Sequence, residues 1–131
     1  LQSYSPLIKV GDVHKMNFPD NSFDIILCGW VLRYSYNRVK AIQEIIRVAK
    51  NSSLVSIGGT DSFNSNVSIN YMTDLGWRPM QKEKDPNVSN DDIKKYMGLN
   101  LQKVYYELNS QDYPKDFKAN KHNIICFSIK K

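Results

Sequence analysis

Residues 23–57 carry a strand–helix–strand pattern, which limits the folds open to this chain more than any other feature does. An apolar run over 23–28 ends at Gly29-Trp30, and a second run over 54–57 ends at Gly58-Gly59. Continuous apolar runs, without alternating polar residues and bounded by turn residues, are typical of strands covered on both faces. Two such strands joined through a helix predict a parallel βαβ unit with a right-handed crossover.

The connecting residues 37–50 have the spacing of an amphipathic helix. Apolar side chains recur at helical intervals, and charged or polar side chains stand between them. The apolar positions are Val39, Ile42, Ile45, Ile46 and Ala49. We expect Asn37 to cap the start of this helix and Asn51-Ser52 to end it.

Three weaker patterns lie outside that unit. Residues 7–10 are a short β-prone run that ends at Gly11-Asp12, and they predict a further strand. Residues 66–75 predict a helix that Gly76 stops, and 82–88 predict a loop. A variant of the capping box over 89–92 predicts a short helix that ends at Gly98.

The C-terminal thirty residues hold two apolar runs, 103–108 and 123–129, joined by the polar stretch 109–122. No helical period is visible in the connector, so the two runs predict an antiparallel pair. The fold class predicted is therefore α/β, with a mixed sheet of about five strands and an antiparallel C-terminal hairpin.

Composition bounds the function classes. At 131 residues and 41% hydrophobic, the chain suits a single domain over 1–131, and no apolar run is long enough to cross a bilayer or resembles a secretory signal. Cys28 and Cys126 sit inside apolar runs, as free thiols do. We therefore expect a cytoplasmic protein. The chain begins with Leu1, which leads us to expect that it is part of something larger.

The charge pattern argues against a nucleic-acid partner. The chain has 18 basic and 13 acidic residues, a net charge of +5, but lysines are spread along it with acids between them. A phosphate-binding surface needs basic residues gathered on one face. The dinucleotide, phosphate-loop, zinc and nucleophile-elbow motifs are absent, and His14 and His122, the only histidines, are expected to have surface or structural roles.

Ligands of open α/β sheets bind at the carboxyl ends of parallel strands, so candidate site residues are sought there. Asp12 could accept hydrogen bonds from hydroxyl or amino groups, Gly29 would let a ligand approach the backbone, and Trp30 offers a flat apolar wall. A turn or capping role for Asp12 is the alternative.

Residues 11–28, Gly-Asp-Val-His-Lys-Met-Asn-Phe-Pro-Asp-Asn-Ser-Phe-Asp-Ile-Ile-Leu-Cys, resemble the middle of class I S-adenosylmethionine-dependent methyltransferases. The helix and strand that follow, through Gly58, fit the same family. The resemblance implies a Rossmann-like sheet in the order 3-2-1-4-5-7-6, with 7–10 as strand 3, 23–28 as strand 4 and 53–57 as strand 5. The two C-terminal runs become strands 6 and 7.

Two departures accompany the resemblance. Strands 1 and 2 and the glycine-rich loop of the family are absent, so the domain is expected to be truncated on its N-terminal side and strand 23–28 to present a bare edge. The stretch 50–53 reads Lys-Asn-Ser-Ser where the family usually has Lys-Pro-Gly-Gly, and Asn51 is expected to take the left-handed turn position.

The resemblance also implies roles for individual residues. Asp12 would accept from the adenine amino group of S-adenosylmethionine and the backbone of Val13 would face the ring. The floor beside the methionine end would be formed by Cys28, Gly29 and Trp30. On the substrate side, Arg33 and Tyr34 stand near the entrance. No general base is evident, and methyl transfer from a sulfonium centre depends chiefly on proximity and alignment.

Two function hypotheses follow. The first is an S-adenosylmethionine-dependent methyltransferase, or a fragment of one that is inactive alone, acting on a small molecule. The second is a catalytically inactive methyltransferase-like module for interaction or oligomerisation, with a homodimer formed through the exposed sheet edge. The methyl acceptor is not named by any residue, and its selectors are expected within about 60–100.

Overall fold

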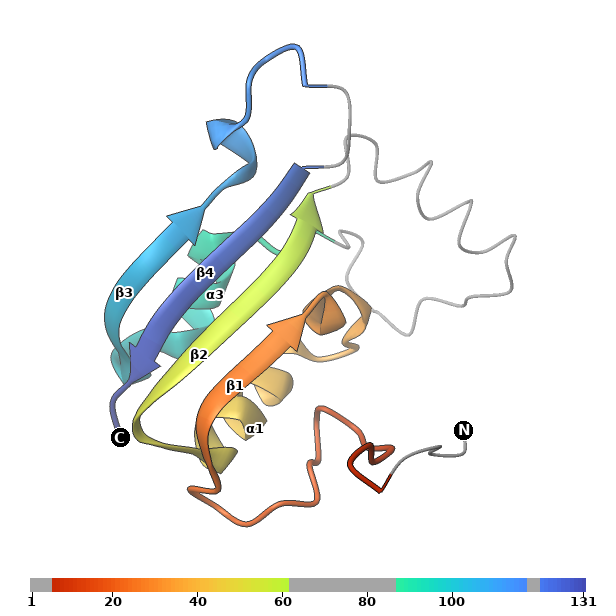
Figure 1. Ribbon diagram of the computed structural model, residues 1–131, viewed down its shortest axis with the longest axis vertical. Helices are drawn as coiled ribbons and strands as arrows, with labels where there is room; N and C mark the ends of the chain where they lie inside the picture. Colours follow the sequence, from red (N-terminus) through yellow and green to blue (C-terminus); the bar gives the residue numbers. More distant parts are fainter. Residues whose placement is uncertain (1–5, 62–86, 118–120) are drawn as a thin grey trace.

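The structure, a computed structural model, describes residues 6–61, 87–117 and 121–131. Its sheet has the order β1-β2-β4-β3 (Figure 1). The strands are β1 (Phe23–Gly29), β2 (Ala49–Asp61), β3 (Leu101–Leu108) and β4 (Lys121–Ile129). The helices are α1 (Arg38–Val48) and α3 (Asn90–Met97), with single 3-10 turns η1 (Val31–Tyr34), η2 (Gly98–Asn100) and η3 (Ser110–Asp112).

The pairing of these strands confirms the predicted topology. β1 and β2 are parallel and joined through α1, and β4 is antiparallel to both β2 and β3. This arrangement is the 4-5-7-6 part of the order that the resemblance implied. The mixed sheet and its antiparallel C-terminal pair are thus as predicted.

The two faces of the sheet differ. Both α1 and α3 lie on one face (Figure 1), and the core forms between them and the sheet. Its largest fully buried side chains include Phe127, Ile42, Ile45, Ile57 and Ile125. Burying side chains of this size contributes about 1.5–3 kcal/mol each, which makes this layer the main source of stability.

No described helix covers the opposite face. Ile25 and Leu27 of β1, paired in register with Leu54 and Ser56 of β2, point to this side. Leu27 is 79% exposed and Ile25 is 62% exposed. Because β1 has only one neighbour in the described sheet, its outer edge is bare, as the sequence predicted.

Both described helices have the caps that the sequence predicted. Asn37 Oδ1 accepts from the backbone N–H of Lys40 (3.0 Å), and Ser89 forms a capping box with Asp92. The end of α1 is corrected, however. The helix stops at Val48 and passes straight into β2, and Ser52, not Asn51, takes the left-handed position at φ 65°.

The strand predicted over 7–10 is wrong, and the described sheet has four strands instead of about five. These residues are exposed and belong to no ladder, Leu7 being 93% exposed. A strand persists where a neighbouring strand pairs with it, and no described strand pairs with 7–10. The predicted helix 66–75 and the loop up to residue 86 lie outside the described residues.

Candidate functional site

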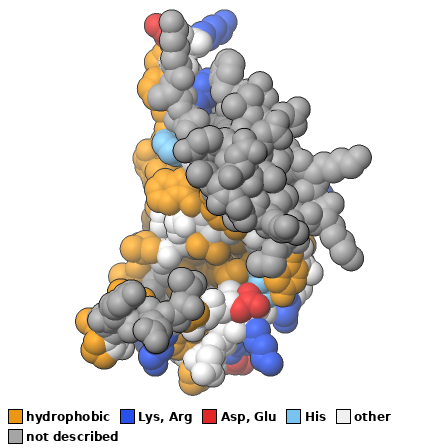
Figure 2. Space-filling view, turned by 90° about the vertical axis from the view of Figure 1, so that its right-hand side faces the viewer, with side chains coloured by type: hydrophobic (Ala, Val, Ile, Leu, Met, Phe, Trp, Pro, Cys, Tyr) orange, Lys and Arg blue, Asp and Glu red, His pale blue; other side chains and the backbone are white. Residues whose placement is uncertain are grey.

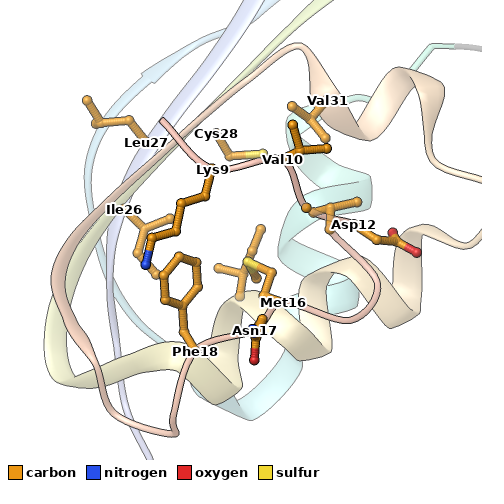
Figure 3. A pocket seen from close by; sticks show the side chains of 13 residues that line it. Lys9, Val10, Asp12, Met16, Asn17, Phe18, Ile26, Leu27, Cys28 and Val31 are labelled. Carbon is orange, nitrogen blue, oxygen red and sulfur yellow. The ribbon is translucent and has the colours of Figure 1, made fainter. Parts of the chain in front are cut away.

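The candidate site lies between the edge of β1 and the segment 9–18, which crosses in front of α1 (Figure 3). A cavity of about 550 Å³ opens there, within the range of small-molecule sites. Its lining is mostly apolar and includes Val10, Val13, Phe18, Ile26 and Ile45. Figure 2 shows hydrophobic side chains gathered on this side of the molecule.

Polar side chains of α1 hold the segment in place. The Arg47 guanidinium donates through Nη2 to the carbonyl of Met16 (2.9 Å) and through Nη1 to the carbonyl of Phe18 (2.8 Å) and to Asp20 (2.7 Å). Glu44 Oε2 accepts from the backbone N–H of Met16 (2.9 Å) and from Arg47 (2.9 Å). One ion pair on a helix thus fixes the backbone of the cavity wall.

The charges of this pair reinforce each other. Hydrogen bonds from Arg47 hold the pKa of Glu44 below its usual value, and the bond from the Met16 N–H acts in the same direction. Hydrogen bonds to Glu44 and Asp20 in turn raise the pKa of Arg47. The Glu44 side chain is only 9% exposed, so water solvates its carboxylate poorly. Hydrogen bonds from Arg47 and Met16 stabilise the buried charge in place of water.

Asp12 lies at one end of the cavity, with the Phe18 ring and the Lys9 ammonium at the other (Figure 3). Its Oδ1 accepts from the backbone N–H of His14 (2.8 Å) and lies 2.6 Å from His14 Nδ1. The backbone hydrogen bond is the main cause of a lowered pKa of Asp12, so this carboxyl is ionised at neutral pH. His14 is buried and satisfied, which agrees with the structural role expected for it.

Cys28 lines the cavity from β1 and is buried. Burial raises the pKa of its thiol to about 11, so the thiol is neutral at pH 7 and contributes apolar surface and no nucleophile. Gly29 follows it at the carboxyl end of β1. Among the described residues nothing lies within 4 Å of a Cβ built on Gly29, which leaves the space above this backbone open.

Trp30 has left-handed backbone at φ 56°, which is uncommon for a bulky residue and turns the indole out of the strand. Its Nε1–H donates to Thr60 Oγ1 (2.7 Å), and its ring meets the His122 ring edge to face at 5.9 Å between centroids. Thr60 Oγ1 also lies 3.3 Å from His122 Nδ1. Trp30 just after β1, Thr60 of β2 and His122 of β4 therefore form a cluster at this end of the sheet.

The predicted site residues separate into two groups. Asp12, Val13 and Cys28 line the cavity together. Gly29 and Trp30 lie beyond it at the end of β1, and Arg33 and Tyr34 lie on η1, the next turn of the chain; none of these four lines the cavity.

Sequence reasoning missed the two residues that hold the cavity wall. Glu44 and Arg47 were placed on the polar face of the helix 37–50, where charged side chains are usually solvated. Their spacing of three residues allows an ion pair on one helix face, and this was the available signal. Only the fold shows that this face of α1 looks onto the segment 16–20.

In the part of the chain that the structure describes, no three His, Cys, Asp or Glu side chains gather as metal ligands. Within the same residues, no helix has the length and hydrophobicity that a membrane span needs.

Comparison with known proteins gives the fold its class. The sequence profile of a family described as "Methyltransferase domain" matches residues 2–57, which contain the segment 9–18, β1 and α1. No curated protein sequence matches the chain. The profile match and the fold together confirm the predicted resemblance to the class I S-adenosylmethionine-dependent methyltransferases.

Solved structures share the fold at low identity. The MccD protein is similar with a TM-score of 0.63 and 15% identity, over 92% of this chain and 66% of that one. A putative sarcosine dimethylglycine methyltransferase from Galdieria sulphuraria gives 0.64 and 15%, over 92% and 58%. The trans-methyltransferase CalH, in complex with SAH, gives 0.69 and 13%, over 92% and 35%. The chain thus spans less than two thirds of the length of these structures.

Proposed function

We propose that this chain works as an S-adenosylmethionine-dependent methyltransferase, or as part of one, with a small molecule as the methyl acceptor. One observation supports the proposal, and it concerns where the cavity and the family match lie along the chain. Every residue that lines the cavity, from Lys9 to Ile45, lies within residues 2–57, which match the methyltransferase family.

The cavity fits the adenosine part of this cofactor. Its walls are apolar where a purine ring would lie, and Phe18, Val10 and Ile26 supply flat or branched hydrophobic surface. The ionised Asp12 carboxylate at one end is an acceptor for an exocyclic amino group. This acceptor agrees with the N–H donor that adenine presents at its exocyclic amino group.

The residues of this chain act by binding and orienting. S-adenosylmethionine supplies a methyl group activated by a sulfonium centre. Asp12 and the backbone of Val13 would hold the adenine, and the neutral Cys28 and the open backbone of Gly29 would lie toward the methionine end. Displacement at a methyl group needs alignment of the acceptor above all, which a rigid wall provides.

The acceptor side is proposed at the carboxyl end of β1. Trp30 offers an exposed indole there, and Arg33 and Tyr34 on η1 lie on the same stretch of chain. A mostly uncharged wall with one guanidinium suits a small molecule better than a polymer. We further propose a cytoplasmic location, which the free thiols of Cys28 and Cys126 support.

The test is calorimetric titration of the 131-residue chain with S-adenosylhomocysteine. We expect binding in the micromolar to millimolar range, the span of modest affinities of about −4 to −8 kcal/mol. Asp12→Asn keeps the shape but presents an N–H group where an acceptor stood, and it should weaken binding about tenfold. The control Asp24→Asn removes an exposed carboxylate of β1 that pairs with Lys50, and it should leave the affinity unchanged. Equal affinity in all three proteins would contradict the assignment.

A second candidate function rests on a different observation. The bare edge of β1 and the exposed Ile25 and Leu27 beside it favour an interaction module that pairs with a second copy of the chain. Sedimentation should then show a dimer that Leu27→Lys converts to monomer. A monomer at all concentrations, together with cofactor binding, would exclude the interaction module and leave the methyltransferase as the supported function.

A further inference from the structure

Asp12, His14 and Ser35 form a chain of hydrogen bonds that neither the family resemblance nor the cavity explains. His14 Nδ1 lies 2.6 Å from Asp12 Oδ1, and His14 Nε2 lies 2.7 Å from Ser35 Oγ. The His14 ring is buried and stacks on Tyr36 at 3.8 Å between centroids. Both ring nitrogens are therefore engaged, and the stacking fixes the plane of the ring.

The donors and acceptors of this chain can be assigned. An ionised carboxylate only accepts, so the proton of the neutral ring resides on Nδ1. Nε2 is then an acceptor, and the Ser35 hydroxyl donates to it. Ser35 Oγ in turn accepts from the backbone N–H of Asn37 (3.2 Å), the residue that caps α1.

The same three residue types perform nucleophilic catalysis in hydrolases, but the burial of Ser35 rules out that use here. Ser35 is 4% exposed, so a substrate carbonyl has no access to its oxygen, and its hydroxyl already has two partners. The chain of bonds instead connects the end of the cavity to the start of α1.

We propose that His14 is a positioning residue, which fixes the Asp12 carboxylate so that one oxygen is held by His14 and the other is left for a ligand. Oδ1 receives both the backbone N–H and the Nδ1–H of His14. Two hydrogen bonds within the protein converge on Oδ1, and a purine amino group would have to break them before it could take their place. Oδ2 is the atom that remains to accept from it.

The expected benefit is entropic, and it rests on the proposed function. The Asp12 side chain is 55% exposed and would otherwise sample several rotamers. Ordering such a side chain on binding costs affinity, and His14 has ordered it beforehand. Loss of the Nδ1–H donor should therefore weaken adenine binding about two- to tenfold.

Two isosteric substitutions separate the two bonds. The amide of His14→Asn occupies the place of Nδ1 and can still donate to Asp12, whereas that of His14→Gln reaches the place of Nε2 and retains only the Ser35 bond. We expect His14→Asn to bind S-adenosylhomocysteine nearly as well as the unmodified chain, and His14→Gln to bind it about two- to tenfold more weakly. Equal affinities, or the reverse order, would overturn the proposal.

A double substitution distinguishes positioning from general destabilisation. If His14 acts only through Asp12, adding His14→Gln to Asp12→Asn should cause no further loss of affinity. Additive losses would show that His14 acts elsewhere and would contradict the proposal.

A ligand-free measurement makes the proposal independent of cofactor binding. Nitrogen NMR of the unmodified chain should find His14 protonated on Nδ1, and amide exchange at His14 should be slow and become faster in His14→Gln but not in His14→Asn. Amides of β4 serve as the folding control. Protonation on Nε2, or the same exchange in both variants, would overturn the inference. Absence of S-adenosylhomocysteine binding alongside the predicted NMR result would refute the proposed function and leave the role of His14 standing.

Discussion

Different forces hold two regions of the molecule in place. One region is the packed layer formed by β2, β4, β3, α1 and α3, and the other is the segment 9–20. The layer is fixed by apolar side chains such as Phe127, Ile42 and Ile125, which are fully buried. The segment is fixed by hydrogen bonds to Glu44, Arg47 and Ser35, and much of it is exposed. Burial is non-directional and strong, and hydrogen bonds are directional and individually modest. The layer should therefore set global stability, and the polar contacts should set the shape of the site.

The largest expected effect is in the layer. Phe127 of β4 is fully buried between the sheet and the helices, so Phe127→Ala should cost about 3–5 kcal/mol of unfolding free energy through lost burial and a cavity. Urea unfolding measures this. A loss below about 1 kcal/mol would show that the layer is not the centre of stability.

The segment should respond to Arg47→Met in another way. The substitution keeps the side-chain stem but removes the donors to Met16, Phe18 and Asp20. Amide exchange over 16–20 should become about tenfold faster, because local opening no longer breaks these bonds. Amides of β4 should exchange at rates little changed. An equal acceleration of amide exchange in 16–20 and in β4 would contradict the idea that different forces stabilise the two regions.

The ion pair between Glu44 and Arg47 should make the stability of the chain depend on pH. Arg47 lowers the pKa of Glu44 in the folded chain below its ordinary 4.5. The unfolded chain therefore binds the proton more tightly. The contribution of Glu44 is present above pH 4.5 and is lost as the pH falls through the folded-state pKa. In Glu44→Gln, unfolding followed from pH 6 to pH 3 should show a shallower loss of stability. Parallel curves for the two proteins would contradict the assigned ion pair.

The smallest effect is expected on the open face of the sheet. Leu27 is 79% exposed, so Leu27→Lys should change the free energy of unfolding by no more than about 0.5 kcal/mol. The same urea experiment measures it beside Phe127→Ala. A large loss would mean that another part of the protein covers this face.

The sheet could be predicted from the sequence because its signals are local. Apolar runs bounded by turn residues gave β1, β2, β3 and β4, and helical spacing gave α1. Whether 7–10 forms a strand could not be predicted from local signals, since β propensity does not show whether another strand lies beside it. The left-handed residue of the 50–53 turn was likewise misplaced by one position, onto Asn51 instead of Ser52.

The site was predictable only where the family motif marks it. Asp12, Val13 and Cys28 line one cavity, and their roles toward a cofactor stay predictions. The contacts that hold them depend on which face of α1 meets the segment, and helical spacing does not contain that information. The sequence therefore indicated a solvated side chain for Arg47. The hydrogen bond between His14 and Ser35 joins residues 21 positions apart, and no local pattern predicts it.

The most direct test of the central claim is an amide NMR titration of the 131-residue chain with S-adenosylhomocysteine. We expect chemical-shift changes that saturate and that fall on residues 10–18 and 26–30, which form the cavity wall and the end of β1, while the amides of β3 stay unchanged. Shifts spread evenly over the molecule, confined to β3, or absent at millimolar ligand would contradict the central claim.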